Sequence, residues 1–184
     1  MKKQLLTLAL LTAIAAPSAF AEYVPADATK TQQVSVTVPE VALLAVAGSP
    51  SLTCAKPAAG ANFNCTATTP NSDKITYAIT ANVEAIDSPT LRQITAKVTS
   101  IPASWKLSAL ATTAPGGTAV SSVSLTTTAT NLVTDIGNIA STGGAITYTL
   151  EPAVATTAMA YSGDGATAQN IEVTYTLTDD AAPV

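Results

Sequence analysis

The chain has 184 residues, a formal net charge of −4, no histidine and only 11% charged residues. Without histidine it cannot build a Ser-His-Asp or Cys-His catalytic site, or a histidine-ligated zinc or haem site. Its 8 basic residues are too few to form a phosphate-binding surface, so we expect no nucleic-acid partner. The 47% of hydrophobic residues exclude a disordered chain, and the low charge is more usual for an extracellular β protein than for a housekeeping enzyme.

Residues 1–21 have the pattern of a secretory signal peptide. Two lysines precede an apolar run over residues 5–16, and Ala19-Phe20-Ala21 then supplies small residues at the positions a signal peptidase reads. We predict cleavage between Ala21 and Glu22. The apolar run is shorter than the roughly 20 residues that span a bilayer, and no later segment is long and apolar enough. The sequence therefore predicts an exported protein that passes through the periplasm and keeps no transmembrane segment.

Residues 22–47 form an N-terminal extension with a polar lead and a long apolar track. Before Pro39 apolar and polar residues alternate strictly, as in a half-buried strand, and after it both faces are apolar. Pro39 favours a break, because it lacks an N–H group. Two interpretations remain open: a kinked edge strand of the chain's own domain, or a strand donated to a neighbouring copy. The candidate donor residues are Val34, Val36, Val38, Val41 and Leu43.

Cys54 and Cys65 are the two cysteines of the chain. An even number of cysteines in an exported protein predicts a disulfide. Pro57 and Gly60 lie between them and allow the chain to turn, so the flanking segments can pair as neighbouring strands. A redox-active pair is disfavoured, because such pairs usually have C-x-x-C spacing.

Residues 48–184 read as one domain of many short strands. Apolar residues alternate with polar ones in segment after segment, and clusters of Pro, Gly, Asn and Ser separate them. This pattern indicates an antiparallel β-sandwich or barrel. We expect one face of a strand to carry Ile75, Tyr77, Ile79 and Val83. The aromatic residues predicted in the core are Tyr77, Trp105, Tyr148 and Tyr175, and residues 131–140 and 151–159 could be either strand or loop.

The sequence offers no catalytic, metal or cofactor site. The acidic residues are scattered, and no nucleophile stands in a legible arrangement with a base, so we expect no enzyme. Gly163-Asp164-Gly165 and Asp179-Asp180 lack the spacing of a calcium loop and are better explained as turns.

The signal peptide, the threonine-rich β pattern and the segment Val-Ser-Val-Thr-Val-Pro-Glu-Val at 34–41 resemble the major subunits of bacterial fimbriae, above all the colonisation-factor pilins. The resemblance implies an incomplete immunoglobulin-like β-sandwich, completed by the N-terminal strand of the next subunit. The polar tail over residues 178–184 departs from chaperone–usher pilins, which end in an alternating strand with a penultimate aromatic residue.

The resemblance implies a structural subunit of a cell-surface pilus that polymerises head to tail with itself and supports adhesion or biofilm formation. An assembly chaperone or an outer-membrane secretion pore would be its further partners. The alternative is a monomeric, secreted or periplasmic immunoglobulin-like module. It would bind a glycan or a protein through loops such as 111–119 and 153–165.

Overall fold

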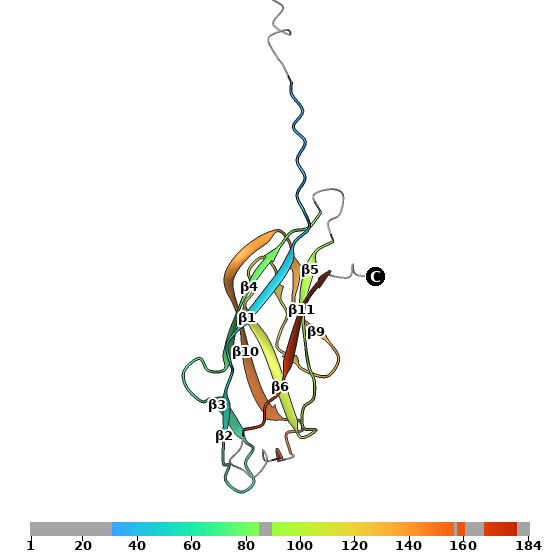
Figure 1. Cartoon of the computed structure of the whole chain (residues 1–184). Coiled ribbons are helices and arrows are strands. Elements are labelled where there is room, and N and C mark those ends of the chain that lie inside the picture. The colour runs from blue at the N-terminus through green and yellow to red at the C-terminus, as the bar shows by residue number, and fades with distance from the viewer. Residues whose placement is uncertain (1–30, 85–89, 157, 161–167, 180–184) are drawn as a thin grey trace, which may run out of the picture. The chain divides into compact units, whose positions relative to one another are not determined.

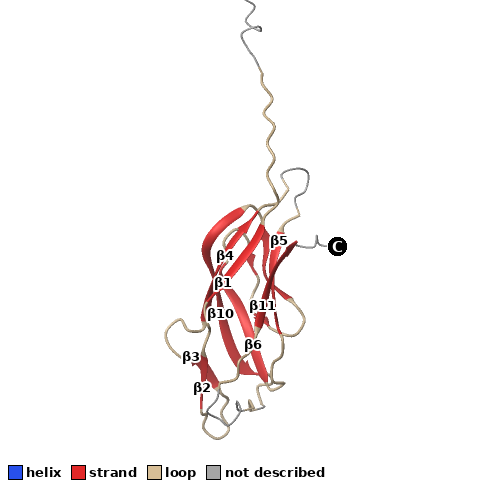
Figure 2. Ribbon diagram, in the orientation of Figure 1, coloured by secondary structure: helices blue, strands red, loops and turns tan. Residues whose placement is uncertain are grey.

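The computed structural model describes residues 31–84, 90–156, 158–160 and 168–179, and this part of the chain forms strands and no helix (Figure 2). The signal peptide and its cleavage site between Ala21 and Glu22 lie outside these residues. The strands are β1 (Ala42–Ala47), β2 (Leu52–Ala55), β3 (Asn64–Ala67), β4 (Lys74–Ala81), β5 (Arg92–Val98), β6 (Trp105–Thr113), β7 (Thr118–Ala119), β8 (Val123–Ser124), β9 (Thr130–Ile136), β10 (Ile139–Pro152) and β11 (Val173–Asp179).

Two antiparallel sheets pack face to face in a β-sandwich (Figure 1). The five-stranded sheet has the order β1-β4-β10-β6-β8, and the four-stranded sheet has the order β11-β5-β9-β7. Neither sheet closes on itself, so the fold is a sandwich and not a barrel. The prediction of an all-β, immunoglobulin-like sandwich is therefore confirmed.

The core lies between the two sheets and follows the predicted alternation. On β4 the side chains of Ile75, Tyr77 and Ile79 are buried as predicted. Ala81 takes the fourth core position, because the strand ends there and Val83 lies beyond it. Residues 131–140, which the sequence left open between strand and loop, lie mostly in β9 and the start of β10. Of residues 151–159, also left open, only the first two belong to a strand, because β10 ends at Pro152.

The disulfide joins Cys54 and Cys65, as predicted. The two cysteines stand directly opposite each other on β2 and β3, which form a separate two-stranded ribbon. The turn between the strands contains Gly60 at a φ of 82°, a left-handed conformation that suits glycine.

Tyr77 packs against a glycine of the neighbouring strand. Gly144 of β10 pairs with Tyr77 beside an irregularity in the β10 register, and a Cβ atom at Gly144 would lie 2.3 Å from Tyr77 Cζ. The buried tyrosine ring therefore occupies the space where any other residue would carry its side chain. The Tyr77 hydroxyl donates a hydrogen bond to the Thr113 carbonyl at 3.2 Å, which fixes the ring in this position.

We predict that Gly144→Ala destabilises the sandwich by about 1–3 kcal/mol or more, because an extra methyl group in a packed core forces its neighbours to move. Gly143→Ala is the matched control, since the nearest atom to its Cβ is Ser141 Oγ at 3.6 Å, an ordinary contact. Urea unfolding of both variants measures the difference. Equal loss of stability in the two would contradict the packing of Tyr77 on Gly144.

Alkaline pH is expected to destabilise the fold through its buried phenols. Burial raises the pKa of Tyr77 to about 12 and raises that of Tyr148 further. The unfolded chain releases these protons near pH 10 while the folded chain keeps them, so stability is complete below pH 10 and falls between pH 10 and 12. We predict a shallower fall for Tyr77→Phe, measured as the slope of the unfolding free energy against pH. An unchanged slope would contradict it.

Candidate functional site

The edges of the two sheets meet along one side of the sandwich. β1 is the last strand of the five-stranded sheet and β11 the last strand of the four-stranded sheet, and the two lie side by side (Figure 1). Among the described residues β1 pairs only with β4, and β11 pairs only with β5. Each strand therefore presents one edge of backbone N–H and C=O groups without a strand partner.

A groove of about 970 Å³ lies beside the end of β1 and the start of β11, where it also reaches the β2–β3 ribbon. Val46 and Gly48 line it on the β1 side, and Ile171, Val173 and Tyr175 line it on the β11 side. The side chains of Leu107, Tyr148 and Leu150 also line it, from β6 and β10. Most of the residues that line the groove are apolar, the polar ones being Thr53, Lys56, Gln169 and Asn170, and the groove reaches core residues.

The strand edges beside the groove are less buried than their pairing partners. Val46 pairs with Tyr77, which is 2% exposed, but Val46 itself is 41% exposed. Val173, Tyr175 and Leu177 pair with fully buried residues of β5 and are themselves only half-buried. Near the junction of β1 and β11, these side chains are therefore more exposed than the residues with which they pair.

The free edge of β11 can be assigned to particular residues. The Thr99 N–H donates to the Glu172 carbonyl at 3.1 Å, so the backbone groups of Glu172 point toward β5. Because these groups alternate along a strand, those of Val173, Tyr175 and Leu177 point toward the groove. The same three residues carry apolar side chains that face the core.

One end of the groove, called here the Trp105 end, is closed by aromatic residues and the disulfide ribbon. Trp105 is half-buried and donates its indole N–H to the Ala160 carbonyl at 2.7 Å. Phe63 and Cys54 line the same region. Trp105 therefore lines the groove instead of lying deep in the core as predicted. This position could not be predicted from the sequence, because alternation indicates which face of a strand is buried and not what lies against that face. The buried hydroxyl of Tyr175 has no hydrogen-bond partner among the described residues.

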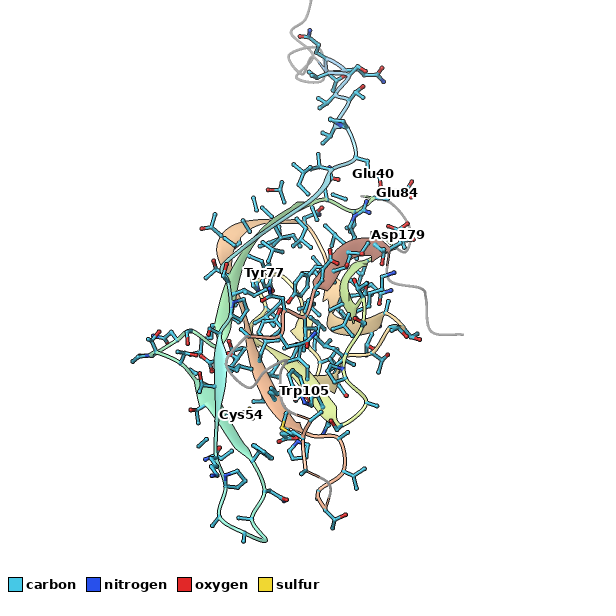
Figure 3. All side chains as sticks on the ribbon, turned by 60° about the horizontal axis from the view of Figure 1, so that its bottom comes forward. Glu40, Cys54, Tyr77, Glu84, Trp105 and Asp179 are labelled. Atoms are coloured by element: carbon cyan, nitrogen blue, oxygen red, sulfur yellow. A yellow bond between two sulfur atoms is a disulfide. The ribbon has the colours of Figure 1, made fainter. Side chains whose placement is uncertain are left out.

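Beyond the other end of the groove lies a charged cluster of Arg92, Glu40 and Asp179, which defines the Arg92 end. Figure 3 labels Glu40 and Asp179, the two carboxylates of this cluster. Arg92 is only 8% exposed. Its guanidinium donates to Asp179 Oδ1 at 2.8 Å, to Glu40 Oε1, and through Nε to the Asn82 carbonyl at 3.2 Å. One arginine thus joins the segment before β1, the end of β4 and the end of β11, a long-range contact that no sequence motif predicted.

Asn82 binds Pro39 and Val41, two of the three residues before β1. Its side-chain oxygen accepts the Val41 N–H at 2.6 Å, and its side-chain amide donates to the Pro39 carbonyl at 2.8 Å. The Asn82 N–H donates to the Val41 carbonyl at 3.0 Å. The direction of the chain at Pro39 is therefore fixed by hydrogen bonds to the end of β4.

The compact sandwich unit begins at Pro39, and the residues before it form a separate unit. Residues 31–38 contain no strand, although their alternation predicted one. Their three valines are exposed: Val34 78%, Val36 75% and Val38 73%.

The structure divides the five candidate donor residues between these two units. Leu43 lies in β1 and pairs with Thr80, and Val41 is bound to Asn82, so both belong to the chain's own sandwich. The separate extension thus ends at Val38 and not at residue 47 as predicted. Val34, Val36 and Val38 remain as candidates for donation.

The loops expected for a monomeric binding module are not brought together in a described site. Residues 111–119 join β6 to β7. Residues 153–165 include 157 and 161–165, which lie outside the described residues. In the described part of the chain no group of three or more metal-ligating side chains occurs, and no helix is long and apolar enough to cross a membrane.

Comparison with known proteins returned no similarity: no protein-family model, no curated protein and no solved structure matches this chain.

The Arg92 cluster yields a prediction about stability. Glu40→Gln or Asp179→Asn alone is expected to cost about 1 kcal/mol, because the guanidinium keeps the other carboxylate. The double variant leaves a buried guanidinium without an anion, and we expect a loss of about 3 kcal/mol, more than the sum of the single losses. Urea unfolding of the four proteins measures the coupling.

Glu151→Gln is the matched control for that cycle. The Lys106–Glu151 pair spans 3.4 Å between two largely exposed side chains, so its loss is expected to cost under about 1 kcal/mol. Strictly additive effects at Glu40 and Asp179 would contradict a shared role for Arg92.

Proposed function

We propose that this chain is the structural subunit of an extracellular filament, in which residues 33–38 of one copy complete the sandwich of the next. The observation that carries the proposal is the apolar groove between two unpaired strand edges, in a chain whose own alternating valines are exposed. An added strand would hydrogen-bond to a sheet edge and fill the groove with every second side chain.

The amounts of exposed apolar surface support a partner of this kind. An unpaired sheet edge beside an apolar groove is an aggregation hazard that proteins usually cover. The extension also exposes apolar surface, because its three alternating valines are exposed. Joining the two in neighbouring copies removes both exposures at once, and one kind of chain is then sufficient for assembly.

The direction of donation follows from the position of Pro39. Val38 is one peptide bond from Pro39, which is held at the Arg92 end by Asn82. If Val38 of the donor lies at the Trp105 end of the acceptor groove, unlike ends of successive copies meet. This heterologous contact repeats without closing and produces a filament.

The opposite direction would bring the two Arg92 ends together. Two copies could then exchange extensions about a two-fold axis and close as a dimer. A filament therefore requires the donated strand to run antiparallel to β11, because β11 ends at Asp179 in the Arg92 cluster.

Substitutions on the two faces of the extension test the proposal. Val36→Asp is expected to abolish filaments, because it would place a charge in the apolar groove at a cost of several kcal/mol. Thr37→Asp is the matched control: its side chain points to the opposite face of the strand, so filaments are expected to form. Electron microscopy and size-exclusion chromatography of the exported protein measure the outcome.

Deletion of residues 22–38 provides a second arm of the same experiment. The sandwich unit begins at Pro39, so the truncated chain is expected to fold as a monomer with a vacant groove. Filaments formed by this truncation would contradict the proposal. A full-length protein that stays monomeric, with its N-terminus protected from proteolysis, would instead favour the monomeric binding module.

A further inference from the structure

The free edge of β11 and the spacing of the valines restrict how the donated strand can be aligned. This inference rests on the proposed function. In an antiparallel pair, residues directly opposite each other share a face. The core-facing residues of β11 are odd-numbered and the three valines of the extension are even-numbered. Only every second alignment therefore buries the valines, since a slip by one residue turns all of them to solvent.

Two of these alignments keep every valine opposite an apolar residue of β11 or of the segment just before it. In the first, Val38 lies opposite Ile171. In the second, the extension is shifted by two residues and Val38 lies opposite Val173. A further shift in one direction brings Val34 opposite Asp179, and a shift in the other brings Val38 opposite Gln169.

We propose that the first alignment is the one used, so that Val38, Val36 and Val34 of the donor lie opposite Ile171, Val173 and Tyr175 of the acceptor. Between Ile171 and the end of β11, these three acceptor residues line the groove and Leu177 does not; Ala168, Gln169 and Asn170 line it before them, and Gln169 is the polar residue that a further shift would place opposite Val38. The second alignment would leave the groove beside Ile171 unfilled and would place Val34 beyond the groove lining.

The backbone geometry makes the alignment measurable. Because Val173, Tyr175 and Leu177 point their backbone groups at the donor, Thr174 and Thr176 occupy non-hydrogen-bonded positions. Directly opposite Cα atoms at such positions are about 4.5 Å apart, within the range of a disulfide, whereas diagonal neighbours are about 7–8 Å apart. Thr174 and Thr176 are both exposed, so cysteine is tolerated at either position.

The experiment combines a donor-side cysteine with one of two acceptor-side cysteines in the full-length chain. The proposed alignment places Ser35 opposite Thr174, and the alignment shifted by two residues places it opposite Thr176. Chains carrying Ser35→Cys are co-assembled with chains carrying Thr174→Cys or Thr176→Cys, oxidised mildly and examined by non-reducing SDS gel electrophoresis. Ser35→Cys alone controls for exchange with the Cys54–Cys65 disulfide.

We expect a covalent dimer when Ser35→Cys chains are mixed with Thr174→Cys chains, and no covalent dimer when they are mixed with Thr176→Cys chains. A dimer with Thr176→Cys and none with Thr174→Cys would overturn the alignment but not strand donation. Filaments that form without either disulfide link would lead to the same conclusion. Absence of both links, together with absence of filaments in the unsubstituted protein, overturns the proposed function and the alignment with it. Because the two added cysteines are on different chains, a disulfide between them reports a contact between copies.

Discussion

The arrangement of this molecule depends on two strand edges that face each other without pairing. β1 and β11 end their sheets on the same side of the sandwich, and among the described residues each has one edge without a strand partner. Backbone hydrogen-bonding groups are strong and specific, and burying them unpaired costs about 1–3 kcal/mol each. An extended strand is therefore the occupant that we propose, because a strand can pair with a sheet edge and present alternate side chains to the groove at the same time.

At both the Arg92 end and the Trp105 end, the contacts join residues that are distant in sequence. At one end Arg92 binds Glu40 and Asp179, residues that lie 52 and 87 positions away. At the other end the disulfide ribbon, Trp105 and the segment before β11 line the same groove. The groove is thus held at both ends by interactions that do not involve its occupant, so it can exist in a single copy of the chain. Under the proposed function, this pre-formed groove is the feature that would allow assembly by strand addition.

The sequence alone was sufficient to predict the buried faces of the strands, but not which strands lie at the edges of the sheets. The alternation in 75–81 and 146–150 identified the buried faces, because period-two burial is a local property of a strand. The pairing of Cys54 with Cys65 was equally local. The groove was not predictable, because it depends on which strands end the two sheets, and strand order is set by long-range packing.

Two particular residues show the same limit within the N-terminal segment. Leu43 and Val36 belong to one apolar track in the sequence, yet Leu43 pairs within the chain's own sheet and Val36 is exposed. Pro39 marked a break between them without revealing which side belongs to the domain. The deciding group is Asn82, whose three hydrogen bonds to Pro39 and Val41 begin the sandwich at that point.

The same hydrogen bonds would favour insertion of the extension into the groove of another copy over insertion into the groove of its own chain. To fill its own groove, the extension would have to reverse direction between Val38 and Ala42 and run back beside β1 as a tight hairpin. Such a turn would require new backbone dihedral angles at Pro39, Glu40 and Val41. Asn82 binds the Pro39 carbonyl and both backbone groups of Val41, and Glu40 is bound to Arg92. Closing the groove from within one chain would break this set of contacts, whereas filling the groove of a neighbour leaves all of them in place.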